Sequence, residues 1–177
     1  MKRVLIIAGV VLIGLFLAFL LFRNFTKSAS PEATAEIEQN GLHIKVAYSQ
    51  PYKKGRKIFG GLVPYGEVWR TGANEATEID FDQDVIVAGQ PLDKGEYSLW
   101  SIPSQAGWIV IFNKETGQWG TDYDQTKDVL RVPVIARKRE KPAEQFFISF
   151  APQPQGTDML LSWDDTEVVV PVRKRDK

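Results

Sequence analysis

The feature that most constrains this chain is an uninterrupted apolar run near its N-terminus, from Val4 to Phe22. The run contains nineteen residues and no charged or strongly polar side chain. As an α-helix it is about 28 Å long, close to the roughly 30 Å hydrocarbon core of a bilayer. The sequence therefore predicts one transmembrane α-helix, with the membrane as a partner of the chain.

A cleaved signal peptide is the alternative interpretation of this run. Such peptides usually have an apolar core of about 7–15 residues that ends at a small-x-small cleavage site. Here the apolar core is followed by bulky residues up to Phe25, and the small residues Ala29 and Ser30 lie well past it. We therefore favour an uncleaved signal anchor over residues 1–27.

The basic residues around the run bear on its orientation. Lys2, Arg3 and the α-amino group precede it, and Arg23 and Lys27 follow it. This slight bias favours a cytoplasmic N-terminus under the positive-inside rule. We expect a single-pass protein of the cell envelope whose folded domain lies in the periplasm or the extracellular space.

Charge and cysteine content exclude several function classes. The chain has 22 basic and 22 acidic side chains, but four basic residues flank the apolar run and no acidic residue precedes Glu32. The remainder is therefore acidic by four charges and repels phosphate backbones, so nucleic acid is not an expected partner. The absence of cysteine excludes disulfides, thiolate metal sites and cysteine nucleophiles.

The rest of the chain has the pattern of an all-β domain. Residues 28–40 are small and polar, and we expect a polar tether or the approach to the first strand. From Gly41 onward apolar and polar side chains alternate, as in half-buried strands, and turn residues separate the runs. Strands are predicted at residues 42–48, 78–81, 85–87, 97–102, 108–113, 129–136, 145–151, 159–163 and 167–172.

Short strands at this spacing favour an antiparallel β-sandwich of about 9–10 strands, with a barrel as the alternative. We assign it to residues 41–172. Residues 173–177 are predicted to be a basic C-terminal tail.

The densest group of candidate site residues lies in the glycine-rich connection over residues 55–77. Trp69, Arg70, Asn74 and Glu75 offer an aromatic face, a guanidinium, an amide and a carboxylate within one short loop. This combination can hold a sugar or another polar metabolite. The alternative is a structural loop that an Arg70–Glu75 pair stabilises and whose Trp69 fills one end of the sandwich.

Several further motifs accompany this loop along the chain. The set comprises Pro51-x-x-x-Gly55-Arg56, Trp69-Arg70-Thr71-Gly72-Ala73-Asn74-Glu75-Ala76-Thr77, Gly95-Glu96-Tyr97-Ser98-Leu99, Ile102-Pro103, Trp108, Asn113, Trp119-Gly120, Tyr123-Asp124, Asp128-Val129-x-Arg131-Val132 and Trp163-Asp164. In these motifs the chain resembles a bacterial family known only as domain of unknown function 2911, over about residues 46–172. The resemblance implies an exported domain, typical of Bacteroidetes, with no established activity. Gln50 departs from it, because an arginine is expected before the proline.

Other motifs give weaker indications of chemistry. Asp80-x-Asp82-x-Asp84 has the spacing of a calcium loop but lacks its glycine and its distal glutamate. His43 is the only histidine, and neither a catalytic serine elbow nor further zinc ligands accompany it. We therefore predict no metal site, no cofactor and no catalytic triad.

Three function classes remain. The favoured class is a non-catalytic module that binds a polar small molecule, a glycan or a protein. An enzymatic function is less favoured. The predicted ligand-binding residues are Trp69, Arg70, Asn74, Glu75, Thr77, Tyr97, Trp119 and Tyr123. The alternatives are a hydrolase of envelope carbohydrate that uses two of Glu67, Glu75 and Glu78, and a purely structural domain. The sequence gives no oligomeric state.

Overall fold

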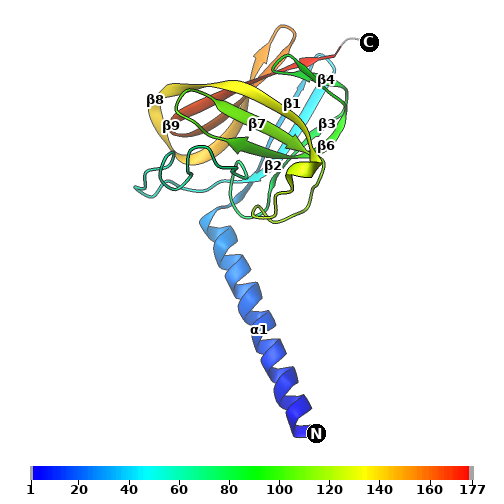
Figure 1. Cartoon of the computed structure of the whole chain (residues 1–177), viewed down its shortest axis with the longest axis vertical. Coiled ribbons are helices and arrows are strands. Elements are labelled where there is room, and N and C mark those ends of the chain that lie inside the picture. Colours follow the sequence, from blue (N-terminus) through cyan, green and yellow to red (C-terminus); the bar gives the residue numbers. More distant parts are fainter. Residues whose placement is uncertain (1, 176–177) are drawn as a thin grey trace.

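A computed structural model describes residues 2–175, without the side chains of residues 4–6, 8 and 20–25. Helix α1 (Lys2–Ala29) precedes the β domain and projects away from it (Figure 1). It covers the predicted span from Val4 to Phe22, although both of these side chains and that of Arg23 lie outside the described ones. A search confined to the described residues finds no helix with the length and hydropathy needed to cross a membrane.

Nine strands follow α1 within the described residues, and every neighbouring pair is antiparallel. They are β1 (Glu32–Gln39), β2 (Leu42–Ser49), β3 (Thr77–Phe81), β4 (Val85–Val87), β5 (Gln90–Leu92), β6 (Gly95–Ile102), β7 (Trp108–Asn113), β8 (Asp128–Gln153) and β9 (Gly156–Lys174). The prediction of a mostly antiparallel β domain is therefore confirmed.

The strands form one continuous sheet in the order β1-β2-β3-β6-β7-β8-β9-β4-β5. The sheet is open, with β1 and β5 at its two ends, so the barrel alternative is wrong. One long strand connects its halves, because β8 pairs with β7 through its first residues and with β9 through the rest. Within the pairing of β8 with β9, the register shifts between Lys138 and Phe147.

These long strands differ from the predicted ones. Residues 129–136 and 145–151 were expected as separate strands but belong to β8, and 159–163 and 167–172 both belong to β9. Charged side chains between the apolar runs join the two strands, since Arg137 and Arg139 both form ion pairs with Glu167 of β9. β9 also extends to Lys174, which pairs with Val85 of β4, so the expected basic tail begins inside a strand.

Strand β1 lies where the composition predicts a polar tether. It pairs with β2 along its whole length, and the turn between them contains Asn40 and Gly41, both with positive φ. Asn-Gly is the residue pair that a tight hairpin turn prefers. The inward side chains of β1 are Ala33, Ala35 and Ile37, which pack against the core. Small residues that alternate with glutamate therefore form a strand here, although the hydrophilic composition of the segment does not indicate one.

The main core lies between the two halves of the sheet. Inward side chains of β2 and β3, such as Ile44 and Ile79, are fully buried against those of β9, such as Val170. The alternation that predicted the strands also predicted this set, since every second residue faces inward. A smaller cluster of Ala76, Trp100 and Ile111 lies apart from the main core.

Candidate functional site

The predicted site loop packs its half-buried tryptophan, Trp69, against the main core. The Trp69 ring stacks on Trp163, with centroids 5.9 Å apart and an interplanar angle of 20°. Phe146 and Phe59 approach the same ring edge-on at 5.3 and 6.0 Å. The indole N–H donates to the carbonyl of Gly72 at 3.2 Å. Most of the stacking surface of Trp69 is thus engaged in packing.

The polar residues of this loop contact the protein backbone. Arg70 donates to the carbonyl of Gly120 at 3.1 Å, and burial lowers the pKa of its guanidinium. Asn74 is buried and donates to the carbonyl of Ser30 at 3.3 Å. Thr77 is fully buried and donates to the carbonyl of Thr71 at 2.9 Å. These three side chains hold the loop in shape.

The predicted aromatic residues outside the loop lie in different places. Tyr97 is buried beside Phe81 and Phe112 and donates to the carbonyl of Asp93. Trp119 is 37% exposed, and its backbone bridges to Glu75. The predicted residues therefore do not line one common cavity.

Tyr123 belongs to a separate polar cluster beside Trp100. Its hydroxyl donates to Asp128 at 2.6 Å and accepts from Arg131 at 2.7 Å. Burial, followed by the hydrogen bond to Asp128, raises the pKa of Tyr123 to about 12. Tyr123 is consequently a neutral hydrogen-bonding group over the physiological range.

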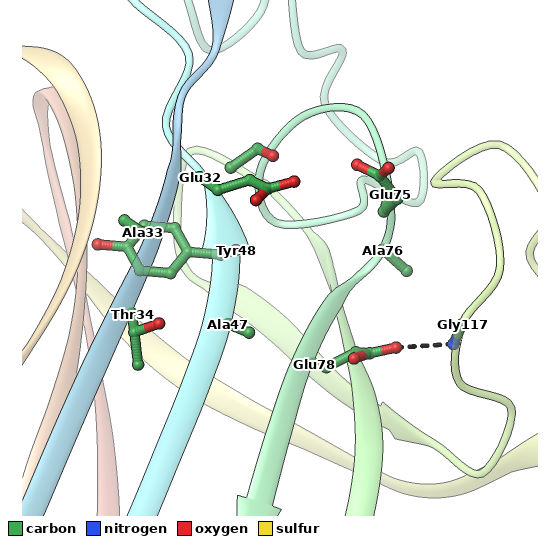
Figure 2. A pocket seen from close by; sticks show the side chains of 10 residues that line it. Glu32, Ala33, Thr34, Ala47, Tyr48, Glu75, Ala76, Glu78 and Gly117 are labelled. Atoms are coloured by element: carbon green, nitrogen blue, oxygen red, sulfur yellow. Dashed lines mark hydrogen bonds between the residues drawn. The ribbon is translucent and has the colours of Figure 1, made fainter. Parts of the chain in front are cut away.

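Tyr97 lines a cavity beside Asp93 and Lys94, and Glu75 lines another. The cavity at Glu75, the acidic hollow, has a volume of about 580 Å³ and lies where β1, β2 and β3 begin or end beside α1 (Figure 2). Its lining consists of three glutamates, small apolar residues and a few polar groups: Glu32, Ala33, Thr34, Ala47, Tyr48, Ser49, Glu75, Ala76, Glu78 and Gly117.

The strand register explains why a hollow forms here. Ala47 of β2 lies between Thr34 of β1 and Glu78 of β3, and directly paired residues share one face of a sheet. The small alanine leaves a low floor between two longer side chains. Backbone hydrogen bonds from Ala76 to Gln118, and from Gly120 to Asn74, fasten the neighbouring loop along one side.

Two of the three carboxylates of the acidic hollow share a partner. Glu78 accepts from the backbone N–H of Gly117 at 2.7 Å, as Figure 2 shows. Lys27, near the end of α1, places its ammonium 2.5 Å from Glu32 and 3.2 Å from Glu75. Hydrogen bonds to Glu32 and then Glu75 raise the pKa of Lys27. The expected Arg70–Glu75 pair is replaced by these contacts.

Sequence reasoning missed Lys27 and Glu32 as members of this site. Both belong to segments that were interpreted as anchor and tether. The period-two placement of Glu32, Thr34, Glu36 and Glu38 was the available signal, since it puts all four on one face. Glu67, the third carboxylate considered for hydrolysis, is exposed and does not line the acidic hollow.

Metal-binding arrangements are not found in the described part of the chain, which holds no cluster of three or more suitable side chains. In the Asp80-x-Asp82-x-Asp84 motif, Asp82 contacts His43 at 2.7 Å. Asp84 accepts from the backbone N–H of Lys94 at 3.0 Å. These residues thus have local structural partners.

Comparison with known families gives one match. The family model described as "Protein of unknown function (DUF2911)" matches residues 30–172. No curated protein and no solved structure matches the chain. The match begins just before β1 and ends in β9, so it contains the acidic hollow but not α1.

Proposed function

Since the chain belongs to the family described as protein of unknown function (DUF2911), we propose that it is a membrane-tethered binding module of the cell envelope. Its ligand is a polar small molecule that carries an amino group. The observation that carries this proposal is the ammonium of Lys27 between Glu32 and Glu75. A ligand amine would take the place of that ammonium, and Glu78 is a third carboxylate of the same lining.

The lining of the acidic hollow supports this ligand class. Carboxylates provide charge-assisted hydrogen bonds for an ammonium group. Ala33, Ala47 and Ala76 offer apolar contact for a carbon skeleton, and Thr34 and Ser49 offer hydroxyls. Few polar groups on a mostly apolar wall are typical of small-molecule sites. The volume of about 580 Å³ lies within the usual range for such ligands.

The tether rests on the apolar run from Val4 to Phe22 and on the helix α1 that includes it. The basic residues before the run favour a cytoplasmic N-terminus, which would place the β domain in the periplasm or outside the cell. Alkaline carbonate extraction should leave the full chain in the membrane pellet. Recovery of a soluble form that starts after residue 27 would contradict the anchor and favour cleavage.

A thermal-shift experiment on the full chain in detergent tests the ligand class. Glucosamine and N-acetylglucosamine form a matched pair, because acetylation removes the positive charge and keeps the ring. At about ten times its Kd, glucosamine should raise the Tm by about 3–6 °C. N-acetylglucosamine should have a much smaller effect, and spermidine serves as an amine without a ring.

Two variants decide whether the acidic hollow is responsible. Glu75→Gln should abolish the shift with glucosamine, whereas Glu140→Gln, an exposed carboxylate in β8 outside the hollow, should preserve it. An equal response of both variants would exclude the acidic hollow as the binding site. No shift with any amine at millimolar concentration would contradict the ligand class.

Hydrolysis of envelope carbohydrate is a second candidate, favoured by the presence of Glu75 and Glu78 in one hollow. Glycosidases of both stereochemical classes use such a pair of carboxylates. Under this proposal Glu75→Gln or Glu78→Gln abolishes turnover of chromogenic glycosides while binding persists. A wild-type chain that binds glucosamine but releases no chromophore from these glycosides would contradict the enzyme.

A further inference from the structure

His43 lies between two carboxylates that come from different strands. It is the only histidine of the chain and is located in β2. Its Nε2 is 2.7 Å from an oxygen of Glu36 in β1, and its Nδ1 is 2.7 Å from an oxygen of Asp82, just after β3. The imidazole therefore connects β1 to the end of β3 across the strand that separates them.

This geometry requires a proton on both ring nitrogens. A neutral imidazole has one N–H donor and one acceptor, whereas an ionised carboxylate only accepts. Both contacts are hydrogen bonds only when His43 is an imidazolium that donates twice. The hydrogen bonds to Glu36 and then Asp82 raise the pKa of His43 above its ordinary value.

The surrounding charges act in the same direction. Glu38 pairs directly with His43 across β1 and β2, and Asp80 lies in β3 two residues before Asp82. Lys45, which pairs with both Glu36 and Asp80, is the cation on this face closest in register. An imidazolium thus faces carboxylates from β1 and from β3, with Lys45 opposing them from its own strand.

Apart from its hydrogen-bonded ladder with β2, the strand that His43 holds contributes little apolar surface to the core. β1 is an end strand of the sheet, and it contributes only Ala33, Ala35 and Ile37 to the core, all partly buried. Little apolar area stabilises such a strand. Edge strands with few buried apolar contacts open at a lower free energy than the rest of a fold. β1 also follows α1 directly, so its attachment determines how firmly the helix is joined to the domain.

We propose that His43 is a proton-dependent clamp, which ties β1 to the end of β3 as an imidazolium and releases the edge strand when it loses its proton. The clamp does not rest on the ligand proposed above, although Glu32, Ala33 and Thr34 of the same strand line the acidic hollow. It is fully closed below about pH 6.5, where histidine is protonated in the folded and the unfolded chain. It is lost as the pH rises through the raised pKa of the folded protein.

NMR of the single imidazole, in the full chain in detergent micelles, measures the first part of the proposal. The pKa of His43 should lie above the ordinary value and should decrease in both Glu36→Gln and Asp82→Asn. Glu38→Gln is the matched control, because it removes a nearby charge but not a hydrogen bond to the ring. Glu36→Gln should therefore lower the pKa more than Glu38→Gln does.

Hydrogen exchange, corrected for the intrinsic effect of pH, measures the second part. Exchange in β1 should increase roughly two- to fivefold across the titration, the range that exposed ion pairs usually produce, while exchange in β7 stays constant. In His43→Gln the β1 amides should exchange at every pH as fast as those of the wild type do above the titration of His43. The exchange rate of this variant should show no increase across that titration. A wild-type imidazole that titrates at or below its ordinary pKa would overturn the clamp. So would the same pH profile of β1 exchange in wild type and His43→Gln.

Discussion

The aromatic cluster around Trp69 and the acidic hollow beside Lys27 are neighbours along the site loop, yet they consist of opposite kinds of side chain. The aromatic cluster brings Phe59, Trp108, Phe146 and Trp163 together with Trp69 at centroid distances of 4.8–6.2 Å. The acidic hollow has three glutamates above a floor of alanines.

This contrast separates stability from recognition. The aromatic cluster fills space between the two halves of the sheet, so its rings contribute buried area. The acidic hollow leaves space unfilled and keeps carboxylates at its surface, which contributes little to folding but provides groups for a ligand. A chemically rich loop can therefore serve packing in its first half, at Trp69, and recognition in its second half, at Glu75.

Trp163→Ala should produce the largest effect, because Trp163 is almost fully buried and touches three other rings of the aromatic cluster. We expect a loss of about 3–5 kcal/mol in the free energy of unfolding. Urea denaturation of the full chain in detergent measures it. Ile135→Ala, at a side chain that is 73% exposed, should cost about 1 kcal/mol or less. Equal losses would remove the contrast between a packed cluster and an open surface.

Gly120→Ala tests the border between the two regions. A Cβ at Gly120 would lie 2.0 Å from the Cδ of Arg70 and 2.7 Å from the backbone oxygen of Asn74. We expect a loss of about 1–3 kcal/mol, the usual cost of overpacking. The double variant with Arg70→Ala should recover only part of it, because the Asn74 oxygen remains. Full recovery would show that Arg70 alone sets the position of this loop.

Lys27→Met should have the smallest effect on stability, because its partners in the acidic hollow are partly exposed to water. We expect a change below about 1 kcal/mol in the free energy of unfolding, as for other exposed ion pairs. The same variant should strengthen glucosamine binding, since the competing ammonium is gone. A stability loss as large as that of Trp163→Ala would assign Lys27 to folding and not to recognition.

The strand content of the domain could be predicted from the sequence because alternation is a local property. The prediction of strands failed where an element has few large apolar residues, as in β1, whose inward positions are mostly alanine. The prediction also failed for β8, because Arg137 and Arg139 lie within one long strand and form ion pairs with Glu167 of β9. That partner is about thirty residues away in the sequence, so a local pattern does not reveal it.

Only Glu75 of the predicted site residues also lines the acidic hollow. Side-chain chemistry singled out Trp69 and Arg70 as candidate ligand-binding residues, but it could not tell whether a ring faces a cavity or the core. The hollow itself depends on the register that sets Ala47 between Thr34 and Glu78. Register is a tertiary property, fixed by pairings between segments that are distant in the chain.

The length of β8 and β9 has a consequence for how this domain folds. β8 carries the ladder from β7 to β9, so neither half of the sheet can complete its pairing before this strand is in place. Many of the contacts that β1 and β2 make, such as that of Tyr48 with Ile148, cannot form until residues a hundred positions later in the chain are in place. Chains dominated by such distant contacts cross the folding barrier slowly, in milliseconds to seconds. We therefore expect the domain to acquire its structure late, only after nearly all of it has left the ribosome.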